Sequence, residues 1–291
     1  MVAGKTRMAA RRTTGARLSI TRKIVNSLAV CALATVGVIA APQAAAAERN
    51  MVLFGDSVLA DPSSPTYLAG RMANGSSKQR PGSCPNSADN FGKRAARKLG
   101  LRVRDFSCAG AVSMSKGPQI SGQVDAAIAS GALNRSTRRV VFSTGFNDTY
   151  NNRSLSSAQL RDRWVRYNAP QIRRIKRAAP NARVQIVGYP DIAAGNKVCL
   201  FHIAPNVYDR THLPQIGKWE RDAQSMQVGL ARATGTEFLD LKRSTRDNNM
   251  CAPDHKRYWA GLVDFYAGPG NLPVHINKRG HEHVANVIAR S

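Results

Sequence analysis

A short apolar run, Met51-Val52-Leu53-Phe54, leads directly into the stretch Gly55-Asp56-Ser57-Val58. Such a run predicts a buried strand, because both faces of a central parallel strand are covered by apolar groups. Gly followed by Asp and Ser is typical of a turn that leads into a helix. The serine would then lie just past the carboxyl end of a strand, which is where open α/β sheets bind their ligands.

The same alternation of apolar runs and helical patterns continues along the chain. Strands rich in Val, Ile, Leu and Phe that alternate with helices predict a parallel sheet covered on both faces, that is, a three-layer α/β/α sandwich. The expected strands are Asn50–Phe54, Arg102–Ser107, Arg139–Ser143, Arg183–Gly188 and Glu237–Leu241. The expected helices are Asp89–Leu99, Gln119–Ala129, Ser156–Ala179, Pro214–Ala233 and Asn277–Arg290.

The chain has 291 residues and a formal net charge of +25, with 43% hydrophobic and 21% charged residues. This balance is that of a chain that buries a core, so it excludes a charge-rich disordered protein. Lys and Arg cluster at 93–104, 161–176 and 242–246. Such clusters form a solvated face or attract anionic partners, namely cell-envelope polymers or lipid head groups. Nucleic acid is a poorer partner, because the N-terminal sequence pattern predicts export, which would separate the protein from it.

The first 47 residues have the pattern of a secretory signal. Seven cationic residues precede an apolar stretch from Ile24 to Ala41, and Ala44-Ala45-Ala46-Ala47 follows it. We expect cleavage between Ala47 and Glu48, which leaves one domain, residues 48–291, secreted or associated with the cell envelope. An uncleaved membrane anchor is the alternative, because the apolar stretch approaches the length that spans a bilayer.

Cysteine usage agrees with export. Removal of the signal would leave four cysteines, an even number in an oxidising compartment: Cys84, Cys108, Cys199 and Cys251. Two disulfides are therefore expected, and the sequence alone permits three pairings. Three segments, 60–88, 190–213 and 242–274, are too long for simple turns. Segments of this length are usually functional, so we expect them to contribute to a site.

Three more polar stretches lie at predicted strand ends or helix starts. They are Ser107-Cys108-Ala109-Gly110-Ala111, Thr144-Gly145-Phe146-Asn147-Asp148 and the stretch from His275 to His281. Together with Gly55-Asp56-Ser57, these ordered blocks make residues 48–291 resemble the SGNH hydrolases, also called the GDSL lipase and esterase family. The secreted, disulfide-bearing actinobacterial branch is the most similar. The Gly-x-Ser-x-Gly elbow that marks the α/β-hydrolase fold is absent from the sequence.

The resemblance implies a serine ester hydrolase that works through an acyl-enzyme. Ser57 matches the nucleophile, and His275 matches the base that activates it. The backbone N–H groups of Ser57 and Gly110 and the side-chain amide of Asn147 match the oxyanion hole. The substrate would be a lipid, a small ester or an O-acylated envelope glycan. The alternative class is a non-catalytic cationic module that binds the envelope, and the presence of both nucleophile and base disfavours it.

The chain departs from the family pattern at the residue that orients the base. The family usually has Asp three residues before the catalytic His, and that position here is Leu272. Some relatives use a Ser-His dyad in which a main-chain carbonyl at that position orients the imidazole. We therefore expect the Leu272 carbonyl to accept the Nδ1 proton of His275, with the carboxylate of Asp264 as the alternative.

Two further expectations concern the disulfides and cofactors. We expect the pairs Cys84–Cys108 and Cys199–Cys251, because each would tie together segments at the catalytic edge. His281 and His283 do not predict a metal site, since residues two apart on a helix point to different faces and no Cys or carboxylate stands at zinc-site spacing. With no phosphate-binding glycine loop either, we expect cofactor-free hydrolysis by a monomer.

Overall fold

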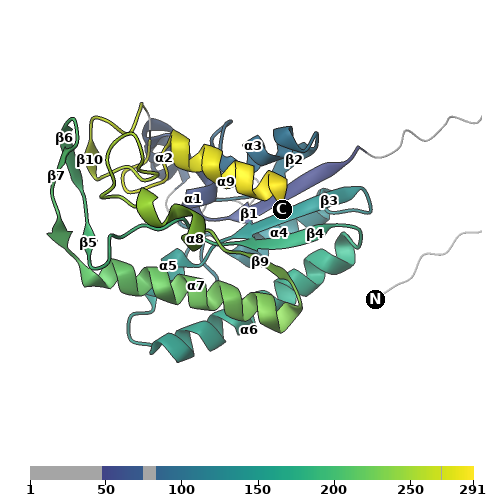
Figure 1. Cartoon of the computed structure of the whole chain (residues 1–291). Coiled ribbons are helices and arrows are strands. Elements are labelled where there is room, and N and C mark those ends of the chain that lie inside the picture. The colour runs from purple at the N-terminus through teal and green to yellow at the C-terminus, as the bar shows by residue number, and fades with distance from the viewer. Residues whose placement is uncertain (1–47, 75–82, 270) are drawn as a thin grey trace, which may run out of the picture. The chain divides into compact units, whose positions relative to one another are not determined.

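The apolar runs of the sequence form the central sheet of the fold. The computed structural model describes residues 48–74, 83–269 and 271–291, and the predicted signal peptide with its cleavage site lies outside them. All neighbouring strands of the five-stranded sheet are parallel (Figure 1). In spatial order they are β2 (Arg102–Asp105), β1 (Asn50–Gly55), β3 (Thr137–Ser143), β4 (Arg183–Val187) and β9 (Glu237–Leu239).

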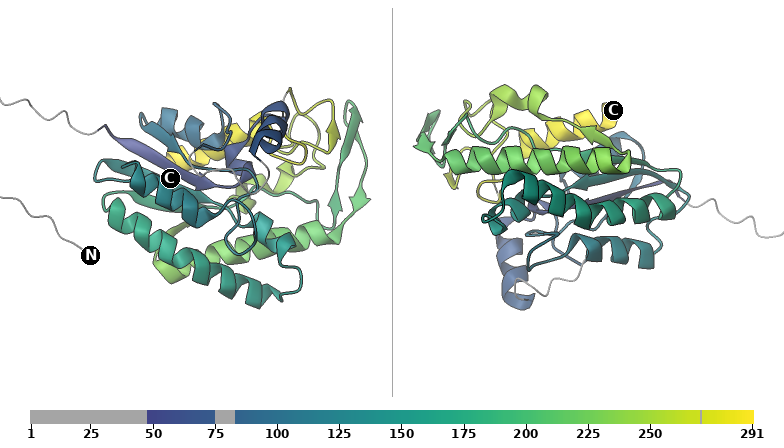
Figure 2. Two further views of the ribbon diagram at one scale, coloured as in Figure 1. Left: turned by 180° about the vertical axis from the view of Figure 1, so that it is seen from behind. Right: turned by 90° about the horizontal axis from the view of Figure 1, so that it is seen from below.

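Helices cover both faces of this sheet, so the predicted three-layer α/β/α architecture is confirmed (Figures 1 and 2). One layer contains α3 (Phe91–Lys98) packed against α9 (Lys278–Arg290). The other contains α4 (Ile120–Ala129), α6 (Ser157–Ala178) and α7 (Pro214–Thr234), with α6 packed on both neighbours. These bounds lie within about two residues of the predicted ones, and side-chain caps set the starts of α3, α6 and α9. For example, Ser156 and Gln159 form a reciprocal capping box at the start of α6.

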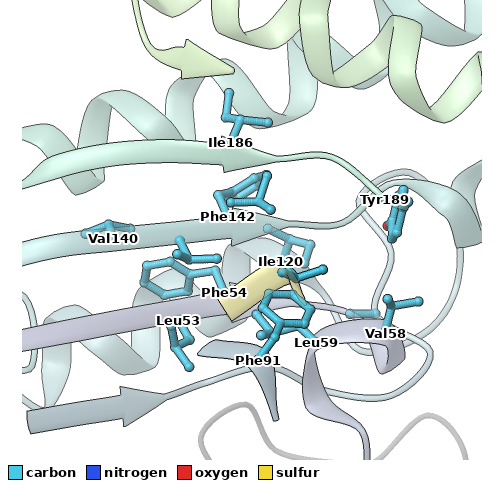
Figure 3. Packing of buried hydrophobic residues seen from close by; sticks show 14 of the residues in the cluster. Leu53, Phe54, Val58, Leu59, Phe91, Ile120, Val140, Phe142, Ile186 and Tyr189 are labelled. Atoms are coloured by element: carbon cyan, nitrogen blue, oxygen red, sulfur yellow. The ribbon is translucent and has the colours of Figure 1, made fainter. Parts of the chain in front are cut away.

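The core lies on both sides of β1, where the side chains from Met51 to Phe54 are completely buried. Figure 3 shows Leu53 and Phe54 beside Phe142 of β3, with Val58 and Tyr189 near the carboxyl ends of the strands. Burial on both faces explains why these strands read as continuous apolar runs rather than as alternating patterns.

The three long connecting segments contain structure that the sequence pattern does not predict. Two short helices, α1 (Ser57–Ala60) and α2 (Ser64–Asn74), follow β1, and α5 (Phe146–Asn151) follows β3. Two small sheets, β10-β6-β7 and β5-β8, are built from the second and third segments. Their elements, with the neighbouring helices, are β5 (Lys197–Val198), β6 (Phe201–Ala204), β7 (Val207–Tyr208), β8 (Thr211–His212), α8 (Lys242–Thr245), η1 (Arg246–Asn248) and β10 (Val263–Asp264).

The structure contains the two disulfides expected from the sequence. Cys84 is joined to Cys108 and Cys199 to Cys251, with Cα–Cα distances of 5.2 and 5.0 Å. Each bridge ties a long segment to another part of the carboxyl edge of the sheet, and all four cysteines are buried. The long segments are thereby held in place by covalent bonds as well as by packing.

Removing either bridge should destabilise the protein by restoring entropy to the unfolded chain. The bridges span sequence separations of 24 and 52 residues, for which chain entropy predicts losses of about 3.5 and 4 kcal/mol. The double variants Cys84→Ala/Cys108→Ala and Cys199→Ala/Cys251→Ala should therefore unfold at lower urea concentration than the parent. Denaturation curves that coincide with that of the parent would contradict this expectation.

Candidate active site

The site lies where the strand order changes direction. Strand β1 has β2 on one side and β3 on the other, and chain segments leave the carboxyl ends of β1 and β3 in opposite directions to form the two helical layers. Ligands of open α/β sheets bind at such a switch point. Ser57 follows β1 at this position, and Asn147 follows β3.

Ser57 is the first residue of α1, and its neighbours fix it. Asp56 caps the helix by accepting a hydrogen bond from the N–H of Val58 at 3.0 Å. The Asp56 N–H donates to the Ser143 carbonyl at the end of β3. Gly55 must be glycine, because an added Cβ would lie 2.6 Å from that same carbonyl oxygen. These contacts hold the turn against the end of β3. Ser57 is the first helical residue after the turn.

Asp56 is buried, and burial raises its pKa to about 7. Hydrogen bonds from the Tyr189 hydroxyl (2.5 Å, to Oδ2) and from Val58 act in the opposite direction but do not offset desolvation. Tyr189 lies just beyond β4, so the pair connects the turn after β1 with the segment after β4. With a pKa of about 7, Asp56 keeps its capping role and on average carries only part of a negative charge beside Ser57 at neutral pH.

Gly110 and Asn147 come together on the other side of the switch point. Gly110 has a φ of +78°, a left-handed conformation that favours glycine, and an added Cβ there would meet no atom within 4 Å. Asn147 donates one amide hydrogen to the Ala111 carbonyl at 2.9 Å, and its Oδ1 accepts from the Tyr150 hydroxyl. This fixes which end of the amide is the donor and leaves its second N–H for a ligand.

A buried carboxylate holds the loop that carries Gly110. Asp148 accepts hydrogen bonds from the backbone N–H groups of Ser113 and Met114 and from the indole of Trp164. Burial raises the pKa of Asp148 to about 6, although these hydrogen bonds act to lower it. Residues adjacent to Asn147 and Gly110 are therefore connected through one carboxylate.

The structure differs from the expectation for the partner of His275. The Nδ1 atom lies 2.8 Å from the carbonyl oxygen of Pro273, and not against the carbonyl of Leu272. The reason is the backbone at Val274, whose φ of +57° turns the chain so that the Pro273 carbonyl faces the ring two residues ahead. A β-branched residue is rarely found in this region, and such strain is concentrated at functional sites.

The alternative partner, Asp264, is engaged elsewhere. Its carboxylate forms an ion pair with the guanidinium of Arg257 and accepts a hydrogen bond from the Gly261 N–H. These contacts hold the pKa of Asp264 below its usual value although burial acts to raise it. The carboxylate thus stabilises the segment that precedes His275 and does not orient the ring.

The Pro273 contact fixes the tautomer of His275. A carbonyl oxygen only accepts, so Nδ1 carries the proton and Nε2 presents a lone pair. In the part of the chain that the structure describes, Nε2 has no protein partner. Burial lowers the pKa of His275, with His281 acting in the same direction and the Pro273 carbonyl and Asp61 in the opposite one. The imidazole is therefore mainly neutral at pH 7.

One cavity is lined by all four residues that the sequence predicts for the site. It has a volume of about 570 Å³ and is lined by Ser57, Gly110, Asn147 and His275. Within residues 48–74, 83–269 and 271–291, no acceptor is found for the N–H of Ser57 or of Gly110. The rest of the wall is mostly apolar: Val58, Leu68, Phe146, Ile192, Val198, Leu200, Leu213, Ile216, Met250, Trp259, Leu272 and Val274.

Sequence reasoning missed several residues of this site. Tyr150 and Tyr189 line the cavity, and Tyr189 could have been found because it follows a predicted strand. His281 accepts a hydrogen bond at Nδ1 from the Phe91 N–H, and its Nε2 lies 3.0 Å from the carboxylate of Asp61.

Among the described residues, no group of three or more His, Cys, Asp or Glu is placed to hold a metal ion.

A parallel α/β sandwich with this cavity at the carboxyl ends of its strands is the architecture of the SGNH hydrolases. The chain belongs to the GDSL-like lipase/acylhydrolase family, whose model matches residues 53–283. It is accordingly a carboxylic ester hydrolase.

Solved structures with low sequence identity share the fold. A phospholipase A1 from Streptomyces albidoflavus is 17% identical, with a TM-score of 0.53 over 82% of this chain and 99% of that one. An extracellular lipase from Streptomyces rimosus is 18% identical, with a TM-score of 0.50 over 82% of this chain and 98% of that one. A search of curated protein sequences finds no match.

The buried carboxyl of Asp56 should make stability fall between about pH 4 and pH 7. Its pKa in the folded state, about 7, lies above the unfolded value of 3.8. The folded state therefore binds more protons in this range, and the free energy of unfolding decreases as pH rises. Relative to Asp56→Asn, the parent should lose up to about 4 kcal/mol between these pH values. Urea denaturation of both proteins at several pH values measures this difference, and parallel curves would contradict it.

Proposed function

We propose that residues 48–291 form a secreted ester hydrolase in which Ser57 is the nucleophile and His275 the base. The observation that carries this proposal is the single cavity lined by Ser57, His275, Gly110 and Asn147 together with apolar side chains. In such a cavity an ester can place its carbonyl carbon beside the hydroxyl while its acyl chain contacts the apolar wall.

In the first step, Ser57 Oγ attacks the carbonyl carbon of the ester. Its proton passes to Nε2 of His275, which carries the free lone pair because Nδ1–H is directed at the Pro273 carbonyl. The tetrahedral intermediate collapses to an acyl-enzyme, and the proton moves from Nε2 to the departing alkoxide. Hydrogen bonds of this kind are often formed fully only when substrate is bound.

Three N–H groups would stabilise the oxyanion that develops in this step. The backbone N–H groups of Ser57 and Gly110 lack protein acceptors in the described residues, and the Asn147 amide has one hydrogen to spare. Because the donors are held by the surrounding backbone, little reorganisation is needed as charge develops. In the second half-reaction, water gives a proton to Nε2 and its oxygen bonds to the acyl carbon. The bond between that carbon and Ser57 Oγ then breaks, Oγ takes the proton back from Nε2, and the carboxylic acid leaves.

The base works without a carboxylate partner in this proposal. The Pro273 carbonyl orients the ring and selects its tautomer, but it bears no full negative charge and so stabilises the imidazolium less than an Asp would. The lowered pKa of His275 has the compensating effect that the neutral, proton-accepting form predominates at neutral pH.

The cavity wall favours an acyl chain over a bare acetyl group. The long segments were expected to contribute to the site, and two of their apolar residues, Leu200 and Trp259, line the cavity. Phe201, Ile203 and Phe265 instead lie exposed on the surface, because the strands of the small β10-β6-β7 sheet direct them outward. A lipid or small carboxylic ester is therefore the preferred substrate class, with O-acylated envelope glycans as the alternative.

Export is part of the proposal. Two disulfides form and persist in oxidising compartments. Of the residues that the structure describes, none belongs to a helix long and apolar enough to cross a membrane. The proposed signal, residues 1–47, would be removed after Ala47.

The test of this proposal is turnover of p-nitrophenyl esters from acetate to palmitate by the purified protein. Ser57→Ala and His275→Ala should each abolish nearly all activity. The rate of the parent should rise with pH through the lowered pKa of His275 and be constant above it, because only the neutral imidazole accepts a proton. If turnover did not depend on Ser57, the non-catalytic envelope-binding module would be the better interpretation.

Asp264→Asn provides the matched control. It should lower thermal stability, because it weakens the ion pair with Arg257, but leave turnover within about tenfold of the parent. In a Ser-His-Asp triad, the same exchange costs about ten-thousand-fold in turnover. A loss of several thousand-fold in folded Asp264→Asn protein would mean that a carboxylate completes a triad.

Asn147→Ala should reduce kcat by about a hundred- to a thousand-fold with little change in KM. The amide would meet a charge that exists only in the transition state, so its loss affects turnover more than substrate binding. Steady-state kinetics on the best ester of the series separates the two effects. An unchanged kcat with a raised KM would make Asn147 a substrate-binding residue instead.

A further inference from the structure

The small sheet formed by β10, β6 and β7 has its apolar side chains on the outside. In the parallel pairing of β10 with β6, Val263 lies opposite Phe201, and the ladder continues to Phe265, whose N–H donates to the His202 carbonyl. These outward side chains are strongly exposed: Phe201 43%, Ile203 60%, Val263 40% and Phe265 73%. Sheets with one solvated face normally show the opposite arrangement.

The inner face of the same sheet is polar and buried. His202 and Asp264, which are opposite each other in the register, point inward, and Asp264 pairs there with the fully buried Arg257. A shift of the strands by one residue would expose this ion pair and bury the apolar set. The buried ion pair therefore fixes the register that keeps the aromatic and aliphatic groups outward.

This exposed face lies at the same end of the fold as the catalytic cavity. Leu200, the residue before Phe201, lines the cavity, as do the exposed side chains of Leu68, Leu213 and Val274. Figure 1 shows the small sheet at the end of the fold toward which the carboxyl ends of the central strands point. The cavity, the exposed apolar side chains in its wall and the outer face of the small sheet are therefore at one end of the molecule.

Cations are the more exposed charged groups around this face. Exposed Lys197, Arg210 and Lys256 lie on segments that flank the small sheet. The acidic side chains of the same segments are held by internal hydrogen bonds. Asp209 accepts from the N–H groups of Leu200 and Phe201, and Asp254 accepts from Arg257.

We propose that the outer face of the β10-β6-β7 sheet docks on an anionic lipid surface and places the mouth of the cavity against the lipid. Exposed aromatic and aliphatic groups enter the head-group region, and the flanking cations are attracted to the negative lipids. A second copy of the chain is a poorer occupant, because residues 48–291 carry a net charge of +18, that is, +25 less the seven cations of residues 1–47, and two faces of the same charge repel each other.

Binding is tested separately from catalysis by using protein with Ser57→Ala, which cannot consume the lipid if the proposed function is right. Co-sedimentation with vesicles of phosphatidylglycerol and phosphatidylcholine should exceed that with phosphatidylcholine alone and should fall as salt rises. Adding Phe201→Ser/Phe265→Ser should lower the partition coefficient at least tenfold. Tyr167→Ser, at an exposed site on α6, is the matched control and should leave it unchanged.

Activity provides the second readout. With Ser57 intact, Phe201→Ser/Phe265→Ser should hydrolyse a soluble short ester within about twofold of the parent but act at least tenfold more slowly on an ester carried in anionic vesicles. Equal vesicle binding by the double variant and the parent would overturn the docking proposal. So would a dimer, detected by sedimentation, that the double variant dissociates. Vesicle binding without any Ser57-dependent turnover would instead overturn the proposed function and leave the docking surface standing.

Discussion

The side-chain amide of Gln123 makes two hydrogen bonds with the backbone of Gly55, accepting from its N–H and donating to its carbonyl, both at 2.9 Å. The N–H of Cys108 donates to the same Gly55 carbonyl. The N–H of Asp56, the residue after Gly55, donates to the carbonyl of Ser143 at the end of β3. One turn is thereby connected to α4, to the segment after β2 and to β3. The position of Ser57 relative to Gly110 and Asn147 depends on this set of contacts, because each comes from one of the connected segments.

In residues 48–74, 83–269 and 271–291, the region behind the site contains two buried carboxyl groups, and neither has a cation as its partner. Asp56 and Asp148 are held instead by a hydroxyl, an indole and backbone N–H groups, and burial raises the pKa of both. Burying such groups costs stability. In return, they connect the turn after β1, the glycine loop and α5 through short polar contacts that fix the direction of each donor. A purely apolar packing would fill the same space but would not specify those directions.

Much of the fold could be predicted from the sequence, because strands buried on both faces leave continuous apolar runs and helices leave capping residues. The gathering of Ser57, Gly110 and Asn147 in one cavity follows from parallel strands that end at the same edge, and His275 joins them from the segment that leads into α9. The Pro273 contact could not be predicted, since it depends on a left-handed Val274, which residue preferences argue against. The small sheet was missed for a related reason: its pattern is apolar outside and polar inside, so rules that expect apolar side chains in the core assign its residues to the cavity wall.

The contact between Pro273 and His275 has a consequence for how this protein tolerates change. In an enzyme whose base is oriented by an aspartate, a single nucleotide change can delete the orienting group. In the mechanism proposed for this protein the group is the Pro273 carbonyl, and since every residue type carries a peptide carbonyl, no substitution at position 273 removes it chemically. The orientation of the imidazole depends instead on the backbone conformation, and therefore on the residues that hold positions 273 to 275 in place. Among them are Gly261, whose carbonyl accepts from the Val274 N–H, and Ala260, whose N–H donates to the His275 carbonyl. In a family with this arrangement, substitutions would therefore be constrained at the small residues next to the histidine segment rather than at an aspartate.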